Sequence, residues 1–332
     1  MLLNNKKRIC MGKIQKSYVY DAYWYFASER MSIYCKRLNG EMWPWTSDEI
    51  LKNYKFTNAY RVLDRVSQYL IREIILPDEV GGLSINEKVF RILLFKTFNK
   101  IDTWELLKKS LGEISLKSYD YYKYDKVLER ALVQHDRIYS GAYIMASGKS
   151  CFGYNEKHRN HLRLLEFMMK DDIAKKIQMS ISMQEVFELL KKYPTIGDFL
   201  AYQYAVDINY SAITNYSEMD FVKAGPGAKD GIRKCFTSTE GYSEEDLIKY
   251  VAERQDYEFE RLGLKFHKIV GRKLSLIDCQ NIFCEIDKYS RIAFPECVGV
   301  SGRKRIKQKY KKIEKIYCPV FPSKWGVLQP NC

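Results

Sequence analysis

Histidine is scarce in this chain, and its cysteines are not paired at metal-binding spacings. The four histidines do not combine with a cysteine into a four-ligand zinc set. The nine cysteines lack the Cys-x-x-Cys step that is typical of iron–sulfur clusters. Their odd number and wide spacing favour a reducing cytoplasm and no disulfides. We therefore expect no metal, no cofactor and a cytoplasmic location.

Long apolar runs are missing as well. No uninterrupted apolar stretch is long enough to span a bilayer, and no N-terminal signal peptide is recognisable. Internal repeats and low-complexity linkers are also absent. With 332 residues, of which 46% are hydrophobic, the chain can bury a large core, either as one domain or as two interleaved ones. We expect a monomer that has no membrane partner.

Positive charge, in contrast, is abundant. The formal net charge is +14, so the expected partner is a polyanion, either nucleic acid or an acidic membrane surface. The missing membrane segments favour nucleic acid. One run of basic residues is dense: Arg303, Lys304, Arg305, Lys307, Lys309, Lys311, Lys312 and Lys315. This run is either the solvated face of a helix or a contact to DNA phosphates.

Two glycine motifs of nucleotide-binding proteins are incomplete here. Gly148-Lys149-Ser150 resembles the end of a P-loop, but position 143, where that motif requires glycine, is tyrosine. The segment from Gly225 to Lys234 lacks the spacing of a dinucleotide fingerprint, and no strand precedes it. These motifs therefore predict neither a kinase nor a dinucleotide-binding protein.

A helix-hairpin-helix pattern lies at about residues 183–208. Apolar residues at helical spacing precede Pro194, and a second helical pattern follows Gly197. We expect Gly197 to turn with positive φ, and the free N–H groups at the start of the second helix to bind a DNA phosphate. The expected phosphate contacts of this hairpin are Thr195, Ile196 and Gly197.

A second candidate phosphate site begins at Gly225-Pro226-Gly227. Two glycines and a proline fix a tight loop, whose exposed amides can bind a phosphate or pyrophosphate. The charged residues of this site are Lys229, Arg233 and Lys234. A turn that merely caps a helix is an equally good interpretation.

The hairpin also carries a family resemblance. Tyr193-Pro194-Thr195-Ile196-Gly197 resembles the hairpin of helix-hairpin-helix DNA glycosylases, and Asp220 lies near the position of that family's catalytic aspartate. Other segments resemble a narrower branch of that superfamily, the α-glutamyl/putrescinyl thymine pyrophosphorylase family. They are Pro44-Trp45-Thr46, Phe56 to Arg65, Ser67-Gln68-Tyr69, Phe95 to Lys100, Gly225 to Ala228 and Glu285 to Tyr289. The branch also resembles prokaryotic antiviral glycosylases that excise glycosylated hydroxymethyl-pyrimidines.

The resemblance implies a fold and a domain organisation. The fold is mainly α and helix-hairpin-helix glycosylase-like, with two interleaved helical lobes and a DNA-binding groove. We expect an aromatic-rich segment at residues 1–55 that packs on the C-terminal lobe, a helical core at 56–240, and a C-terminal helical lobe with a basic tail at 241–332.

Two activities follow from the same resemblance. The expected one is a monofunctional DNA glycosylase for antiviral defence, which everts a bulky modified pyrimidine, such as glucosylated hydroxymethylcytosine, in double-stranded phage DNA and excises it. Phe199 stands where backbone-cutting members carry a Schiff-base lysine, which implies an intact abasic site. The alternative is a transferase that adds an amine or amino acid to pyrophosphorylated hydroxymethyluracil in DNA during phage thymine hypermodification.

Asp220 is the expected catalytic residue for excision. A buried carboxylate near the sugar would stabilise the positive charge that develops there and orient a water molecule. A helix cap is the other interpretation of this aspartate. We expect the base pocket to be formed by Gln68, Asn99, Tyr143, Glu285, Asp287 and Lys288. The two amides would read the edge of the base, because an amide offers both a donor and an acceptor.

Overall fold

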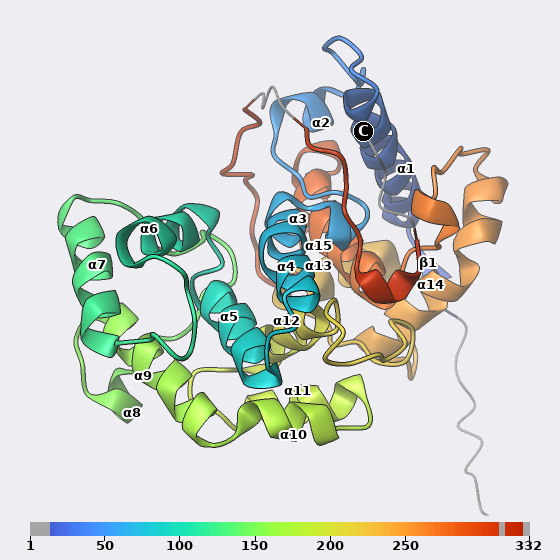
Figure 1. The fold of residues 1–332 in the computed structure, drawn as a ribbon. Helices are drawn as coiled ribbons and strands as arrows, with labels where there is room; N and C mark the ends of the chain where they lie inside the picture. Colours follow the sequence, from blue (N-terminus) through green and yellow to red (C-terminus); the bar gives the residue numbers. More distant parts are fainter. Residues whose placement is uncertain (1–13, 312–315, 328–332) are drawn as a thin grey trace, which may run out of the picture. The chain divides into compact units, whose positions relative to one another are not determined.

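The computed structural model describes residues 14–311 and 316–327 (Figure 1). Helices dominate the described residues, so the prediction of a mainly α protein is confirmed. The strands in these ranges are β1 (Gln15–Lys16) and β2 (Phe236–Ser238), which pair antiparallel. No helix in the described ranges is both long and apolar enough to cross a membrane.

The chain divides into two compact units, each assembled from segments that are distant in sequence. Unit 1 lies within Met1–Arg61 and Val222–Tyr317, and unit 2 within Val62–Phe221 and Cys318–Cys332. A short 3-10 helix, η1 (Arg61–Leu63), stands where the chain passes from one to the other. The three-part division at residues 55 and 240 stays a prediction.

Unit 1 is organised around one long helix, α15, against which α1 and α13 pack (Figure 1). Ser17 caps the start of α1, and the rings of Tyr20, Tyr23 and Trp24 are completely buried. Their burial gives this aromatic helix its place in the core. The helices of unit 1 are α1 (Tyr18–Leu38), α2 (Glu49–Asn53), α13 (Pro226–Cys235), α14 (Glu244–Arg261), η3 (Ile269–Gly271) and α15 (Leu276–Ala293).

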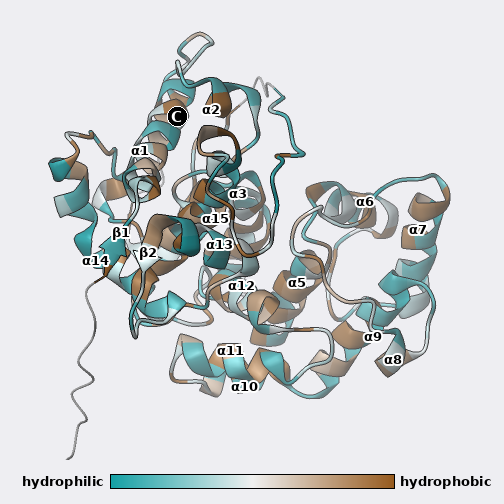
Figure 2. Ribbon diagram, turned by 180° about the vertical axis from the view of Figure 1, so that it is seen from behind, coloured by the Kyte–Doolittle hydropathy of each residue, from teal (hydrophilic) through white to brown (hydrophobic). Residues whose placement is uncertain are grey.

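Unit 2 is organised around α5, which is apolar along most of its length (Figure 2). Every residue from Val89 to Phe98 is buried, because α9, α10 and α12 all pack against this helix. The helices are α3 (Arg65–Leu70), the π-helix η2 (Ile71–Ile75), α4 (Leu76–Val80), α5 (Ile85–Phe98), α6 (Ile101–Leu111), α7 (Tyr121–Val133), α8 (Lys149–Phe152), α9 (Lys157–Lys170), α10 (Ile173–Met179), α11 (Met183–Lys191), α12 (Asp198–Ile208) and η4 (Ser323–Trp325).

One expectation about the covalent structure is wrong. Cys318 carries a disulfide bond, although the cysteine spacing predicts none. Cys35, Cys151, Cys235, Cys279, Cys284 and Cys297 are free thiols. Spacing along the chain could not reveal the bond, since a disulfide depends on where the fold brings two sulfur atoms.

Candidate functional site

The hairpin of unit 2 forms between α11 and α12, which lie against each other. Ser182 caps α11 by accepting a hydrogen bond from the Glu185 amide. In the turn, Thr195 adopts a positive φ of 68°, whereas Gly197 has a φ of −85°. The expectation that Gly197 supplies the left-handed residue is therefore wrong: the bend falls at Thr195, and Gly197 caps α12 in an extended conformation.

The three predicted phosphate contacts of the hairpin differ in exposure. Ile196 is buried, with 3% of its surface exposed, and Thr195 is half-buried against Gly148. Gly197 is exposed, and a Cβ added to it would meet nothing within 4 Å. The open backbone at the start of α12 is thus the part of the hairpin that an anion can reach.

Asp220 lies in an exposed turn near the end of unit 2. None of the hydrogen bonds or ion pairs among the described residues involves its side chain. The expectation of a buried carboxylate is therefore wrong: an exposed carboxylate is surrounded by water, which weakens its interaction with a developing charge.

Asn99 and Tyr143, two of the predicted base-pocket residues, meet around the ammonium group of Lys96. The Lys96 Nζ atom donates to Asn99 Oδ1 at 2.7 Å and lies 4.8 Å from the centre of the Tyr143 ring. It also forms an ion pair with Asp207 at 2.6 Å, and both side chains are almost fully buried. Tyr143 stacks on Phe199, which belongs to the second hairpin helix. The cluster thereby joins α5, α12 and the 139–148 segment within unit 2.

This cluster changes the interpretation of Asn99. Its backbone is left-handed, with a φ of 49°, and it ends α5 as the C-cap residue. Its side-chain oxygen accepts a hydrogen bond from Lys96, and its role as a base reader stays a prediction. The ion pair was not expected from the sequence, although a lysine between the apolar residues Phe95 and Phe98 is a signal of a buried charge.

Gln68, another predicted base-pocket residue, is hydrogen-bonded to backbone at both ends of its amide. Its amide nitrogen donates to the carbonyl oxygens of Val62 and Val320, and its oxygen accepts from the Val320 amide at 2.8 Å. Both ends of the amide are therefore committed to backbone groups of unit 2. The side chain fastens the C-terminal segment to α3, and the prediction that it reads a base has no support from this geometry.

In unit 1, the predicted phosphate loop at Gly225 is the start of α13, with Gly225 as the N-cap. Gly227 and Gly231 lie one turn apart on the helix face that packs on α15. A Cβ on Gly227 would lie 2.2 Å from Cys284 Sγ, and one on Gly231 would lie 1.9 Å from the carbonyl oxygen of Phe283. Both positions therefore require glycine because the two helices approach closely, which is a reason independent of phosphate binding.

The charged residues of the same segment separate into exposed and buried ones. Lys229 and Arg233 are exposed, and Arg233 lies 3.9 Å from Glu244. Lys234 is buried, and its ammonium group lies 2.9 Å from Asp287 Oδ1 and 3.0 Å from Ser290 Oγ. A phosphate can reach Lys229 and Arg233, whereas Lys234 is already neutralised inside unit 1.

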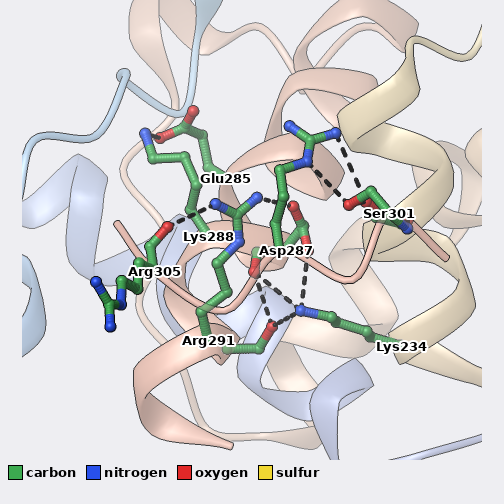
Figure 3. Close-up of polar contacts among 10 residues, drawn as sticks. Lys234, Glu285, Asp287, Lys288, Arg291, Ser301 and Arg305 are labelled. Atoms are coloured by element: carbon green, nitrogen blue, oxygen red, sulfur yellow. Dashed lines mark hydrogen bonds and ion pairs between the residues drawn. The ribbon is translucent and has the colours of Figure 1, made fainter. Parts of the chain in front are cut away.

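Asp287 is the centre of this buried network, which Figure 3 shows in close-up. Lys234 and Arg291 both point to its carboxylate, one to each oxygen. Arg291 also donates to the carbonyl oxygen of Arg305 at 3.0 Å. Asp287 thus pairs with two buried cations. One of them, Arg291, also holds the backbone of Arg305 after α15.

Glu285 and Lys288, one helical turn apart, hold the segment that follows α2. Glu285 accepts a hydrogen bond from the Thr57 amide, and Lys288 donates to the carbonyl oxygen of Lys55 at 2.9 Å. The two side chains also pair with each other at 2.9 Å. Within unit 1, the three residues predicted from the Glu285 to Tyr289 segment position neighbouring backbone, and their role as a base pocket stays a prediction.

The described part of the basic run is not helical. Residues 303–311 contain no helical turn, and Lys309 forms an isolated antiparallel bridge with Tyr54. Backbone hydrogen bonds join Lys55 to Gln308 and Tyr310 to Asn53. The interpretation as a solvated helix face is therefore wrong for these residues. Lys312 and Lys315 lie outside the described residues.

Comparison with known proteins finds a family that matches most of this chain. Residues 17–299 match the family model described as "5-hmdU DNA kinase, helical domain". A protein of Bacillus phage SP10 that is named 5-hmdU DNA kinase is 26% identical over 290 residues, which cover 82% of this chain and 45% of that protein. The chain therefore spans less than half of the length of this relative. No solved structure matches.

These matches overturn the expected activity. The relative is named for a kinase reaction, which transfers a phosphoryl group to DNA, whereas a glycosylase hydrolyses a bond and transfers nothing to DNA. The expectation of a DNA glycosylase in antiviral defence is therefore wrong. A transfer reaction on modified phage DNA, the alternative weighed from the sequence, agrees better with the matches.

Proposed function

Because the chain belongs to the family of 5-hmdU DNA kinase helical domains, we propose that it binds DNA containing 5-hydroxymethyl-2′-deoxyuridine and serves a transfer reaction at the hydroxymethyl group. The observation that carries this proposal is the family match over residues 17–299. The net charge of +14 supports a polyanionic partner.

We assign to this chain the recognition of the modified DNA. In phosphoryl transfer, the hydroxymethyl oxygen would form a bond to phosphorus and lose its proton, while the bond to the leaving phosphate breaks. A P-loop would hold the phosphate donor, but Tyr143 stands at the glycine position and Gly148 instead caps the short helix α8. The incomplete P-loop therefore favours DNA binding over nucleotide binding as the contribution of these residues.

A second candidate is the transfer of an amine or amino acid to pyrophosphorylated hydroxymethyluracil in DNA. The bond from nitrogen to the methylene carbon would form, the carbon–oxygen bond to pyrophosphate would break, and the amine would lose a proton. This reaction needs no nucleoside triphosphate, so the incomplete P-loop favours it. The resemblance of residues 44–289 to the thymine pyrophosphorylase family supports it as well.

The hairpin of unit 2 is the element that we propose for backbone binding. The start of α12 is open at Gly197, and the helix dipole favours an anion there. This proposal retains the helix-hairpin-helix part of the predicted fold. The likeness of the whole fold to that of glycosylases stays a prediction. A monomeric state also stays a prediction.

The proposal is tested by binding and then by product analysis. Fluorescence anisotropy would compare duplexes that are identical except for thymine or 5-hydroxymethyluracil at one position. Tighter binding of the modified duplex is expected, and equal binding would refute the recognition of the modified base.

Product analysis then separates the two reactions. The protein would be incubated either with modified DNA and γ-labelled ATP or with pyrophosphorylated DNA and putrescine, and the nucleosides would be examined by mass spectrometry. A phosphorylated base would identify phosphoryl transfer by this chain itself and would overturn the assignment of DNA recognition alone. A putrescinyl base with released pyrophosphate identifies the second reaction.

A further inference from the structure

In the basic segment after α15, residues 303–311, a basic residue stands at every second position. On an extended chain, successive side chains point to opposite faces. The odd-numbered positions from Arg303 to Lys311 are all basic: Arg303, Arg305, Lys307, Lys309 and Lys311. The even-numbered positions between them are Lys304, Ile306, Gln308 and Tyr310. One face of the segment is therefore entirely cationic, and we refer to these five odd-numbered residues as the cationic row.

The burial of the two faces agrees with this alternation. All five residues of the cationic row are exposed. On the other face, Ile306 and Tyr310 are half-buried, while Lys304 and Gln308 are exposed. Tyr310 stacks on Trp43, with ring centres 5.7 Å apart and nearly parallel planes. The even-numbered face thus attaches the segment to unit 1, and the odd-numbered face is left to the solvent.

The backbone of the segment is fixed at several points. At its start, the Ser301 amide donates to Asp230 at 3.0 Å. In its middle, the carbonyl oxygen of Arg305 accepts from Arg291, which the buried Asp287 network holds in place (Figure 3). Near its end, the segment pairs with the chain around Tyr54. Binding by a flexible segment would cost the conformational entropy of its backbone. Because this backbone is already fixed, aligning the charges with a ligand costs less entropy.

Most of the row is available to an external anion. Lys307, Lys311 and the side chain of Arg305 have no ion pair among the described residues. Arg303 lies 3.7 Å from Asp230, and Lys309 covers the ring of Tyr54 at 3.9 Å. Neither contact removes the positive charge from the surface, because the guanidinium is half-exposed and the ring is uncharged.

We infer that the cationic row binds the phosphodiester backbone of one DNA strand. Alternate residues of an extended chain are roughly 6.7 Å apart. Two residues of polypeptide and one nucleotide of DNA each contribute six backbone bonds per repeat, so a row of cations at every second residue has a repeat similar to that of the phosphates. This inference rests on the DNA-binding part of the proposed function and adds a surface in unit 1.

The test compares the two faces of the same segment. Lys307→Ala and Lys311→Ala remove charges from the row, and Lys304→Ala removes an equal, exposed charge from the other face. Lys265→Ala is a second control, because Lys265 is exposed elsewhere in unit 1. Binding of the full chain to an unmodified duplex would be measured over a series of salt concentrations.

The expected result is specific to the face. Each substitution in the row should weaken binding about 5–10-fold at low salt and reduce the slope of log affinity against log salt by about 0.9, since one counterion-releasing contact is lost. Lys304→Ala and Lys265→Ala should leave both values near those of the wild type. Equal losses for Lys304→Ala and Lys307→Ala would overturn the inference, as would no loss for either.

Two further measurements distinguish DNA-backbone binding by the row from membrane binding and from base recognition. Binding to phosphatidylserine vesicles is measured with the same variants, and a loss there without a loss on DNA would assign the row to a membrane surface and overturn the inference. The preference for 5-hydroxymethyluracil over thymine should be unchanged in the row variants, since backbone contacts carry no base information. If the wild type lacks this preference while the row variants still lose affinity, the proposed function fails and the cationic row stands.

Discussion

Replacing Gly231 by alanine should force α13 and α15 apart and destabilise unit 1. A Cβ at this position would lie 1.9 Å from the carbonyl oxygen of Phe283 and 2.7 Å from its carbonyl carbon. Non-bonded atoms of this kind stay about 3 Å or more apart. Because the obstacle is backbone, no side-chain rotation can relieve the overlap, and the helices must separate by roughly 1 Å or more.

The free-energy change has two opposing parts. Alanine favours the helix over glycine by about 1 kcal/mol. Overpacking typically costs 1–3 kcal/mol, and the separation also disturbs the buried pair of Lys234 and Asp287, whose disruption costs about 3–5 kcal/mol when one partner is lost. We therefore expect a net loss of roughly 2–4 kcal/mol in the free energy of unfolding.

Urea unfolding followed by circular dichroism measures this loss. Gly227→Ala should cost less, because its Cβ meets the Cys284 Sγ atom at the end of a side chain rather than a backbone atom. Gly141→Ala serves as the control, since a Cβ there meets nothing within 4 Å. A Gly231→Ala variant as stable as the wild type would refute the close packing of the two helices.

Three other perturbations test unit 2. Lys96→Met should cost about 3–5 kcal/mol, because the buried Asp207 carboxylate loses the ammonium group that pairs with it, and the double variant with Asp207→Leu should recover most of that stability in the same urea assay. Gln68→Ala should release the backbone of Val320, so that trypsin cleaves after Lys324 faster than in the wild type, whereas unchanged cleavage would refute the fastening role. Burial lowers the pKa of His161 to about 4, so its contribution is complete above pH 6.5 and is lost as the pH falls toward 4, by roughly 3 kcal/mol in all. Burial raises the pKa of Asp78 to about 6, so this group stabilises the fold as the pH falls below 6, opposite to the effect of His161. The difference between the pH dependences of His161→Asn and the wild type therefore isolates the histidine.

The sequence predicts those parts of the fold that local patterns determine. The apolar spacing in residues 183–190 predicts α11, and in the structure Ser182 caps the start of this helix. The start of α15 is likewise marked by a local pattern, because Ser275 and Asp278 form a capping box just before its apolar residues.

Residues with long-range partners were less predictable. Gln68 looks like a base reader because an amide can donate and accept, and only the fold shows that Val320 uses both capacities. Gly227 looks like part of a phosphate loop until α15 lies beside it. The cationic row was predictable in part: the alternation at residues 303–311 has a period of two, which is the signature of an extended chain rather than of a helix.

The discontinuity of unit 1 has a consequence for synthesis on the ribosome. The first helix emerges with Tyr23 and Trp24, whose ring partners, Phe283 in α15 and Phe259 in α14, follow much later in the chain. At translation rates of about 5–20 residues per second, this interval lasts roughly 10–50 s. Most of unit 2 is synthesised during that time, and only its last segment, from Cys318 onward, follows unit 1. Meanwhile α1 lacks these later partners for its rings. The nascent chain therefore presents an aromatic helix to chaperones, and its yield should depend on them more than its final stability suggests.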